Sequence, residues 1–243
     1  MNIKLTIEYD GTRYHGWQLQ PDKETIQGML ERTAEKILGV KIRINGSGRT
    51  DAGVHALGQV ANFFYPGDFD LVRLQKGLNA LTPEDIVVKQ AEAMPEFFDA
   101  RRSARSRIYR YRIWGQPWPS AFYGRFSWHV YGPLDIPAMQ NAIRCLEGEH
   151  DFTSFQGTGS DAAHAVRCVH ENSLSWQDPF WVYAIEANAF LRHMVRNVVG
   201  TLVEVGRRQR SPESFAELLP SRDRTRAGPT APPHGLFLTE VKY

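Results

Sequence analysis

Apolar and polar residues along the chain follow the periods of strands and helices in turn. Near the amino terminus, residues 3, 5, 7 and 9 are apolar or aromatic and their neighbours are polar, which predicts a half-buried strand. From Ile26 to Leu38 the apolar residues take the helical spacing, and Gly39 ends the predicted helix. The same reasoning predicts strands at 42–44, 60–65 and 86–93 and a helix that begins after Asp70.

The second half of the chain follows a similar order of elements without repeating the sequence. It contains predicted strands at 107–114, 166–176, 181–187 and 236–243, and predicted helices at 135–146, at 191–205 and after Ser211. In the first half, the order strand, helix, strand, strand, helix, strand is the split βαβ arrangement of ferredoxin-like domains. The sequence therefore predicts an α+β protein of two halves, residues 1–104 and 105–243.

The stretch from Gly46 to Phe63, GSGRTDAGVHALGQVANF, is rich in residues that build a site and poor in residues that build a core. Its glycines allow the backbone to turn where a side chain would clash. Between them stand a cation, a hydroxyl and a carboxylate, namely Arg49, Thr50 and Asp51. A hairpin with a solvated Arg–Asp pair is the simpler interpretation. The density of polar groups on a loop between two strands favours the interpretation that this loop is catalytic.

The composition is that of an ordinary globular protein. Of the 243 residues 42% are hydrophobic, and the formal net charge is +2. No run of about 20 apolar residues is present to span a membrane. With so small a net charge, attraction to nucleic acid would come from local groups of arginines. Cys145 and Cys168 form no paired motif and the amino terminus carries no apolar leader, so the sequence predicts a soluble, cytoplasmic protein.

The segment FDARRSARSRIYRYRI, residues 98–113, interleaves arginines with tyrosines. On a strand, the side chains at 105, 107, 109 and 111 would share one face, with Arg110 and Arg112 on the other. Guanidinium groups that contact phosphates and rings that stack on bases form this pattern in RNA-binding surfaces. A salt-bridged exposed strand explains the pattern equally well, so both interpretations stay open.

Two further segments carry weaker signals. In FLRHMVRNVVG, residues 190–200, Arg192 and Arg196 lie four apart on a predicted helix and could face one anion, although such arginines more often only flank an apolar helix. The loop GTGSDAAHA, residues 157–165, is interpreted as a connector. The eight histidines are scattered without cysteine partners, so no metal site is predicted.

Several blocks together make the chain resemble the tRNA pseudouridine synthase A family. They stand in the family's order and span nearly the whole chain: YHGWQLQP, GRTDAGVHALGQVANF, FDARRSARSRIYRYRI, HDFTSF, FLRHMVRNVVG and GPTAPPHGLFL. The resemblance implies an isomerase that converts uridine to pseudouridine at positions 38 to 40 of the tRNA anticodon stem-loop, as a homodimer and without a cofactor or required metal. It also implies two RRM-like halves that share a continuous antiparallel sheet, with helices on one side and a central active-site cleft.

The resemblance assigns roles to four residues. Asp51 matches the catalytic aspartate, Tyr109 the tyrosine beside the target base, Arg196 the basic partner of the aspartate, and Arg49 the arginine associated with base flipping. Two chemical routes stay open, with the carboxylate as nucleophile at C1′ or as base at C2′. Both need an ionised carboxylate, which a nearby guanidinium stabilises. Tyr109 can stack on the uracil and remove the C5 proton, and Arg49 can fill the place of the flipped base.

The RNA-contacting positions that the resemblance implies form a larger set. They are Arg49, Gln59, Arg101, Arg105, Arg107, Arg110, Gly159, Ser160, Asp161, Ala162 and Ala163. Family members often have a basic residue after HDFTSF and another in the following loop, where this chain has Gln156 and the acidic Asp161. We therefore expect weaker attraction of this loop to phosphates, with no effect on the chemistry.

Two other functions compete with the synthase. A non-catalytic RNA-binding protein of two RRM-like units would bind RNA without forming product, but VANFFYP lacks the basic-glycine-aromatic pattern of an RNA-binding RRM strand. A hydrolase that uses Asp51 and His55 would lose activity on His55→Ala, but no nucleophile motif accompanies the pair. The synthase is the preferred hypothesis.

Overall fold

Strands and helices form two units in the computed structural model, which describes residues 1–159 and 162–243. The first unit contains residues 1–105 and 237–243, and the second contains residues 106–236. The sequence places the division between residues 104 and 105, one residue earlier. It also assigns the last strand to the second half, whereas the last seven residues pack with the first unit.

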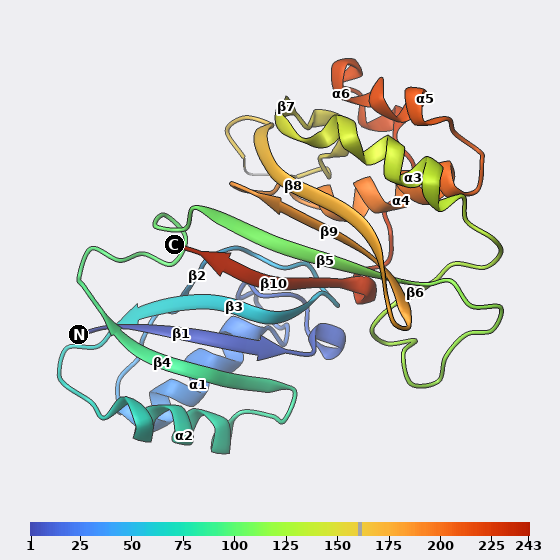
Figure 1. Ribbon diagram of the computed structural model, residues 1–243. Helices are drawn as coiled ribbons and strands as arrows, with labels where there is room; N and C mark the ends of the chain where they lie inside the picture. The colour runs from blue at the N-terminus through green and yellow to red at the C-terminus, as the bar shows by residue number, and fades with distance from the viewer. Residues whose placement is uncertain (160–161) are drawn as a thin grey trace. The chain divides into compact units, whose positions relative to one another are not determined.

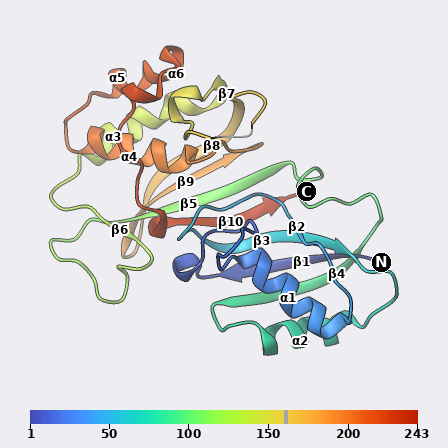
Figure 2. The same ribbon diagram turned by 180° about the vertical axis from the view of Figure 1, so that it is seen from behind.

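The first unit has the split βαβ order that the sequence predicts. Its elements are β1 (Asn2–Tyr9), α1 (Ile26–Leu38), β2 (Asn45–Gly46), β3 (His55–Phe64), α2 (Leu71–Leu81), β4 (Ile86–Met94) and β10 (Leu236–Lys242). The sheet has the order β4-β1-β3-β10, with β2 on β3. Strand β1 runs antiparallel to β3 and β4, and β10 runs parallel to β3. Figures 1 and 2 show α1 and α2 side by side on one face of this sheet.

Local signals explain where the helices of the first unit begin and end. The Thr25 side chain accepts a hydrogen bond from the Gly28 N–H at the start of α1, and Gly39 ends the helix with a φ of +70°. At the start of α2 the Asp70 carboxylate accepts from the N–H groups of residues 72 and 73. Such caps satisfy backbone donors that the first turn leaves unpaired, so the sequence places both helices correctly.

The second unit is also α+β. Its elements are β5 (Ser106–Trp114), β6 (Trp128–His129), α3 (Ile136–Ala142), β7 (Gly148–Asp151), β8 (Val166–Gln177), β9 (Phe180–Ala187), α4 (Met194–Gly206), α5 (Pro212–Ala216) and α6 (Leu218–Ser221). Strands β5, β9, β8 and β7 form an antiparallel sheet in that order, and the short β6 pairs with β5. Helix α3 packs against α4 and α5. The predicted α+β class of two halves is confirmed.

The element boundaries differ from the predictions where no apolar period marks them. The strand expected at 42–44 lies at 45–46 instead, and β3 starts at His55, five residues before the predicted start. Strands β6 and β7 have two and four residues, too short to show a period. Helix α4 starts at Met194 rather than at 191, because His193 takes a left-handed conformation with a φ of +59° and ends the preceding segment there.

Candidate active site

Backbone hydrogen bonds hold the loop between β2 and β3, residues 47–54, which we call the glycine loop. Thr50 is buried, its carbonyl accepts the Trp17 N–H at 3.1 Å, and its hydroxyl lies 2.8 Å from the Tyr9 hydroxyl. The Val54 N–H donates to the Asp51 carbonyl at 3.1 Å. The backbone is therefore bonded on both sides of Asp51, whose side chain is partly exposed.

Two buried polar side chains support the glycine loop from beneath. Burial raises the pKa of Tyr9 to about 12, so its hydroxyl keeps its proton at neutral pH. Gln59 is fully buried, donates to the Gly48 carbonyl at 3.0 Å and accepts from the Ser47 hydroxyl at 2.7 Å. These bonds make Gln59 a support of the loop, and its expected contact with RNA stays a prediction.

A second segment, residues 10–17 between β1 and α1, lies directly against the glycine loop; we call it the clamp loop. A Cβ added to Gly16, which has a φ of +83°, would overlap the Thr50 carbonyl oxygen, and a Cβ on Gly11 would overlap the Val54 carbonyl oxygen. The sequence shows the clamp loop only as an aromatic and polar connection. Its two glycines, Gly11 and Gly16, are the signal of close backbone approach.

His55 has a structural position. Its side chain is 1% exposed, its Nδ1 accepts the Gly11 N–H at 3.1 Å, and its ring stacks on Phe237 at 4.8 Å between centroids. An imidazole that is buried and bonded in this way does not reach a substrate in the free protein. The geometry thus argues against the Asp51–His55 hydrolase.

In the second unit the arginines of β5 have different surroundings. Arg107 is 9% exposed and donates to the Asn188 carbonyl at 2.8 Å, and the Arg112 guanidinium lies over the Phe180 ring at 5.4 Å. Arg110 on the same strand is exposed, as are Arg101 and Arg105 of the first unit and Arg49 of the glycine loop. A uniform RNA-facing row of arginines is therefore not formed by β5 itself. The RNA contacts of all these residues stay predictions.

The two tyrosines of β5 also differ. Tyr109 is 8% exposed, and its ring meets Phe190 edge-on with centroids 4.9 Å apart. Tyr111 is fully buried and donates its hydroxyl to the Pro232 carbonyl at 2.8 Å, and burial raises its pKa. Tyr111 is thus a core residue, whereas Tyr109 lies at the margin of the core.

Arg196, in the first turn of α4, forms hydrogen bonds with Ala231, in a segment that lies far along the chain. Its Nε donates to the Ala231 carbonyl at 2.8 Å, and the Ala231 N–H donates back to the Arg196 carbonyl at 3.0 Å. Arg192 precedes the helix and its guanidinium donates to the Gly159 carbonyl at 3.2 Å. The interpretation that both arginines share one helix face is wrong, because the left-handed residue between them ends the helical spacing.

Asn197 connects α4 to the same distant segment. It is fully buried, and its amide donates to the Phe155 carbonyl at 2.8 Å. Its Oδ1 accepts from the Thr230 hydroxyl at 2.6 Å and from the Arg224 guanidinium at 3.1 Å. The sequence gives no sign of this residue's importance, since an asparagine within an apolar helix pattern carries no partner information.

We expect Asn197→Ala to lower the free energy of unfolding by about 3 kcal/mol, because it leaves buried polar partners unsatisfied. Urea unfolding monitored by circular dichroism measures the change. Asn141→Ala, at an exposed position of α3, is the matched control and should change stability by less than about 0.5 kcal/mol. Equal stability of the two variants would contradict the structural role of Asn197.

The loop after HDFTSF packs on the start of α4. The Gly157 N–H donates to the Arg192 carbonyl at 2.8 Å, and a Cβ on Gly157 would lie 2.7 Å from the His193 ring. Gly159 and Ala163 are exposed and Ala162 is partly exposed. Ser160 and Asp161, two of the expected RNA contacts, lie outside the described residues, and the contacts of the whole loop stay predictions.

The described part of the chain contains neither a cluster of metal-ligating side chains nor a helix suited to cross a membrane. Within residues 1–159 and 162–243, no three His, Cys, Asp or Glu side chains are grouped as metal ligands. Across the same residues, no helix combines the length and apolar character that crossing a membrane requires.

Comparison with known proteins places this geometry in a family. A model described as tRNA pseudouridine synthase matches residues 5–101 and 142–243. The tRNA pseudouridine synthase A of Myxococcus xanthus is 46% identical over 242 residues, which cover 99% of this chain and 91% of the relative. The proteins of the same name from Acetivibrio thermocellus and Moorella thermoacetica are each 43% identical, with at least 99% of both chains covered.

Proposed function

This chain belongs to the tRNA pseudouridine synthase family, and on that premise we propose that it isomerises uridines 38, 39 and 40 of the tRNA anticodon stem-loop to pseudouridine. The observation that carries the proposal is the end-to-end similarity to synthases, which includes the segments that hold the glycine loop. The rigid backbone on both sides of Asp51 supports it, because a catalytic carboxylate must be held in a defined orientation.

The isomerisation needs no external oxidant or reductant. The N1–C1′ bond breaks, the uracil rotates, and a C5–C1′ bond forms; C5 loses its proton and N1 gains one. In one route Asp51 attacks C1′ and is later displaced, and in the other it removes a proton from C2′ and returns it. Both routes use the ionised carboxylate, so the proposal does not depend on the choice between them.

Three other residues are assigned to the same nucleotide. Tyr109 stacks on the uracil and takes the C5 proton, and Arg196 stabilises the charge of Asp51. The bond from Nε of Arg196 to the Ala231 carbonyl supports this role, because it restricts the orientation of the guanidinium. Arg49 is exposed on the glycine loop and fills the place of the uridine in the helical stack, which offsets part of the few kcal/mol that flipping costs. We further propose that the protein acts in the cytoplasm as a homodimer.

The test uses the purified protein and an unmodified tRNA transcript with uridine at positions 38, 39 and 40. Pseudouridine is mapped by reverse-transcription stops after carbodiimide treatment. We expect product at these positions, and no product in a matched transcript with cytidine at all three. Binding of the first transcript with no product at any position would overturn the proposal and establish the non-catalytic RNA-binding protein instead.

A further inference from the structure

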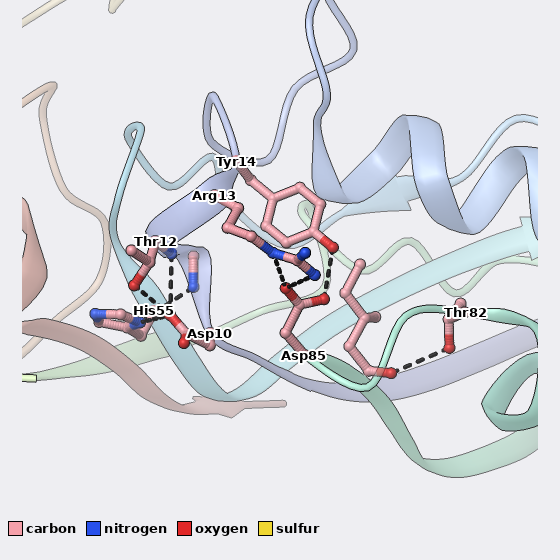
Figure 3. Close-up of polar contacts among 9 residues, drawn as sticks. Asp10, Thr12, Arg13, Tyr14, His55, Thr82 and Asp85 are labelled. Atoms are coloured by element: carbon pink, nitrogen blue, oxygen red, sulfur yellow. Dashed lines mark hydrogen bonds and ion pairs between the residues drawn. The ribbon is translucent and has the colours of Figure 1, made fainter. Parts of the chain in front are cut away.

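The carboxylate of Asp85, in the turn between α2 and β4, joins two residues of the clamp loop. Its Oδ1 accepts the Tyr14 hydroxyl at 2.6 Å, and its Oδ2 accepts Nε and Nη2 of Arg13 at 2.8 and 2.5 Å (Figure 3). The turn itself is fixed, because the Thr82 hydroxyl donates to the Ile86 carbonyl at 3.1 Å. The Asp85 carbonyl also accepts the N–H of Asp10 at 3.0 Å, at the start of the clamp loop.

Tyr14 forms hydrogen bonds through both its side-chain hydroxyl and its backbone carbonyl. Its hydroxyl donates to Asp85, while its backbone carbonyl accepts the Gly53 N–H at 3.2 Å, two residues beyond Asp51. The side chain is 4% exposed. Burial and the adjacent Asp85 carboxylate both raise the pKa of Tyr14, so the hydroxyl remains a donor. A continuous series of hydrogen bonds thus runs from Asp85 through Tyr14 to the glycine loop.

Arg13 shares the carboxylate but has a different position. Its side chain is 65% exposed, against 13% for Asp85. Exposed ion pairs stabilise proteins little, at most about 1 kcal/mol. Figure 3 also shows the start of the clamp loop, where the Thr12 hydroxyl donates to Asp10 within the loop and His55 of β3 lies 3.1 Å from the same carboxylate. The bond between Tyr14 and Asp85 therefore holds the part of the clamp loop that contacts Gly53.

We propose that Asp85 and Tyr14 are positioning residues that hold the clamp loop against the glycine loop and thereby orient Asp51. The inference rests on the proposed function, in which Asp51 is the catalytic carboxylate. Neither residue needs to touch the RNA. Loss of the bond lets the Gly53 end of the glycine loop shift, and a displacement of about 1 Å at a reacting group can cost about 100-fold in rate.

The test compares variants that remove or keep the Tyr14–Asp85 bond. Tyr14→Phe and Asp85→Ala remove it, and each should lower kcat by about 10- to 100-fold with KM and tRNA affinity unchanged. Asp85→Asn keeps an oxygen that accepts the Tyr14 hydroxyl, so it should restore most of the lost kcat. Arg13→Gln is the matched control and should change kcat by less than about threefold. The Tyr14→Phe/Asp85→Ala double variant should be no slower than either single variant, because both remove the same bond.

The kcat of Asp51→Asn is measured together with those of these variants. Three outcomes then decide the inference. If Asp51→Asn is inactive but Tyr14→Phe keeps the wild-type kcat, the positioning role is overturned and the proposed function stands. If Asp51→Asn is fully active, the proposed role of Asp51 is overturned and the positioning role with it. Should Tyr14→Phe not fold, the comparison of Asp85→Ala with Asp85→Asn decides, and equal kcat values would overturn the inference.

Discussion

Asp51→Asn abolishes pseudouridine formation and leaves tRNA binding intact: this is the result we expect with the largest effect. The amide has nearly the shape of the carboxylate. The backbone bonds around it, from the Trp17 N–H to the Thr50 carbonyl and from the Val54 N–H to the carbonyl of residue 51, do not involve the side chain. What is lost is the charge and basicity that both routes require. We expect the single-turnover rate to fall by at least about 1000-fold.

The rate is measured on the uridine-containing transcript with enzyme in excess, and binding is measured by filter retention of the same transcript. Asp68→Asn, at an exposed position of the same unit, is the matched control and should retain full activity. Loss of binding together with activity would point to a role of Asp51 in holding RNA. Full activity of Asp51→Asn would remove the carboxylate from the mechanism.

Gly16→Ala should also be nearly inactive, for a reason that lies in the backbone. Gly16 has a φ of +83°, which costs an alanine about 1–2 kcal/mol, and its added Cβ would overlap the Thr50 carbonyl oxygen. The nearest further atoms are the carbonyl carbon of Asp51 and the nitrogen of Ala52, at 3.0 and 3.1 Å. The clamp loop and the glycine loop must therefore separate, and we expect kcat to fall by about 100-fold.

Gly39→Ala is the control that isolates the cause. Gly39 has a similar φ of +70°, but an added Cβ there would meet no atom within 4 Å. Both variants should lose stability through backbone strain, seen as a lower midpoint of urea unfolding, but only Gly16→Ala should lose kcat. Equal loss of kcat in both would show that general destabilisation, and not contact with the glycine loop, is responsible.

Helix α1 and strand β3 illustrate how far sequence reasoning reaches into the fold. Helix α1 runs over the predicted residues, because its apolar spacing, its Thr25 cap and its final glycine are all local signals. Strand β3 starts earlier than predicted, because residues 55–58 pair through backbone bonds and show no apolar alternation. Helix α4 starts later than predicted, because the conformation of His193 is not visible in its residue type.

The candidate site likewise contains residues that local motifs predict and residues that only the structure reveals. Sequence motifs predict Asp51, Arg49, Tyr109 and Arg196, and the density of glycines and polar groups predicts the glycine loop. No local pattern predicts the roles of Asp85, Asn197 and Ala231. Their partners Tyr14, Arg224 and Arg196 are 71, 27 and 35 positions away along the chain. Hydrogen bonds of that separation leave no period or spacing in a single sequence.

By itself, the sequence determined the α+β class and the family, and it supplied the residues proposed for the chemistry. These follow from apolar periods, local caps and ordered motifs, which are properties of neighbouring residues. Only the tertiary structure decided that Gln59 is a buried support, that Arg192 lies outside α4, and that Asp85 reaches the glycine loop through Tyr14. The physical reason is that burial and hydrogen-bond partners depend on which segments pack together, and that is settled by the whole chain.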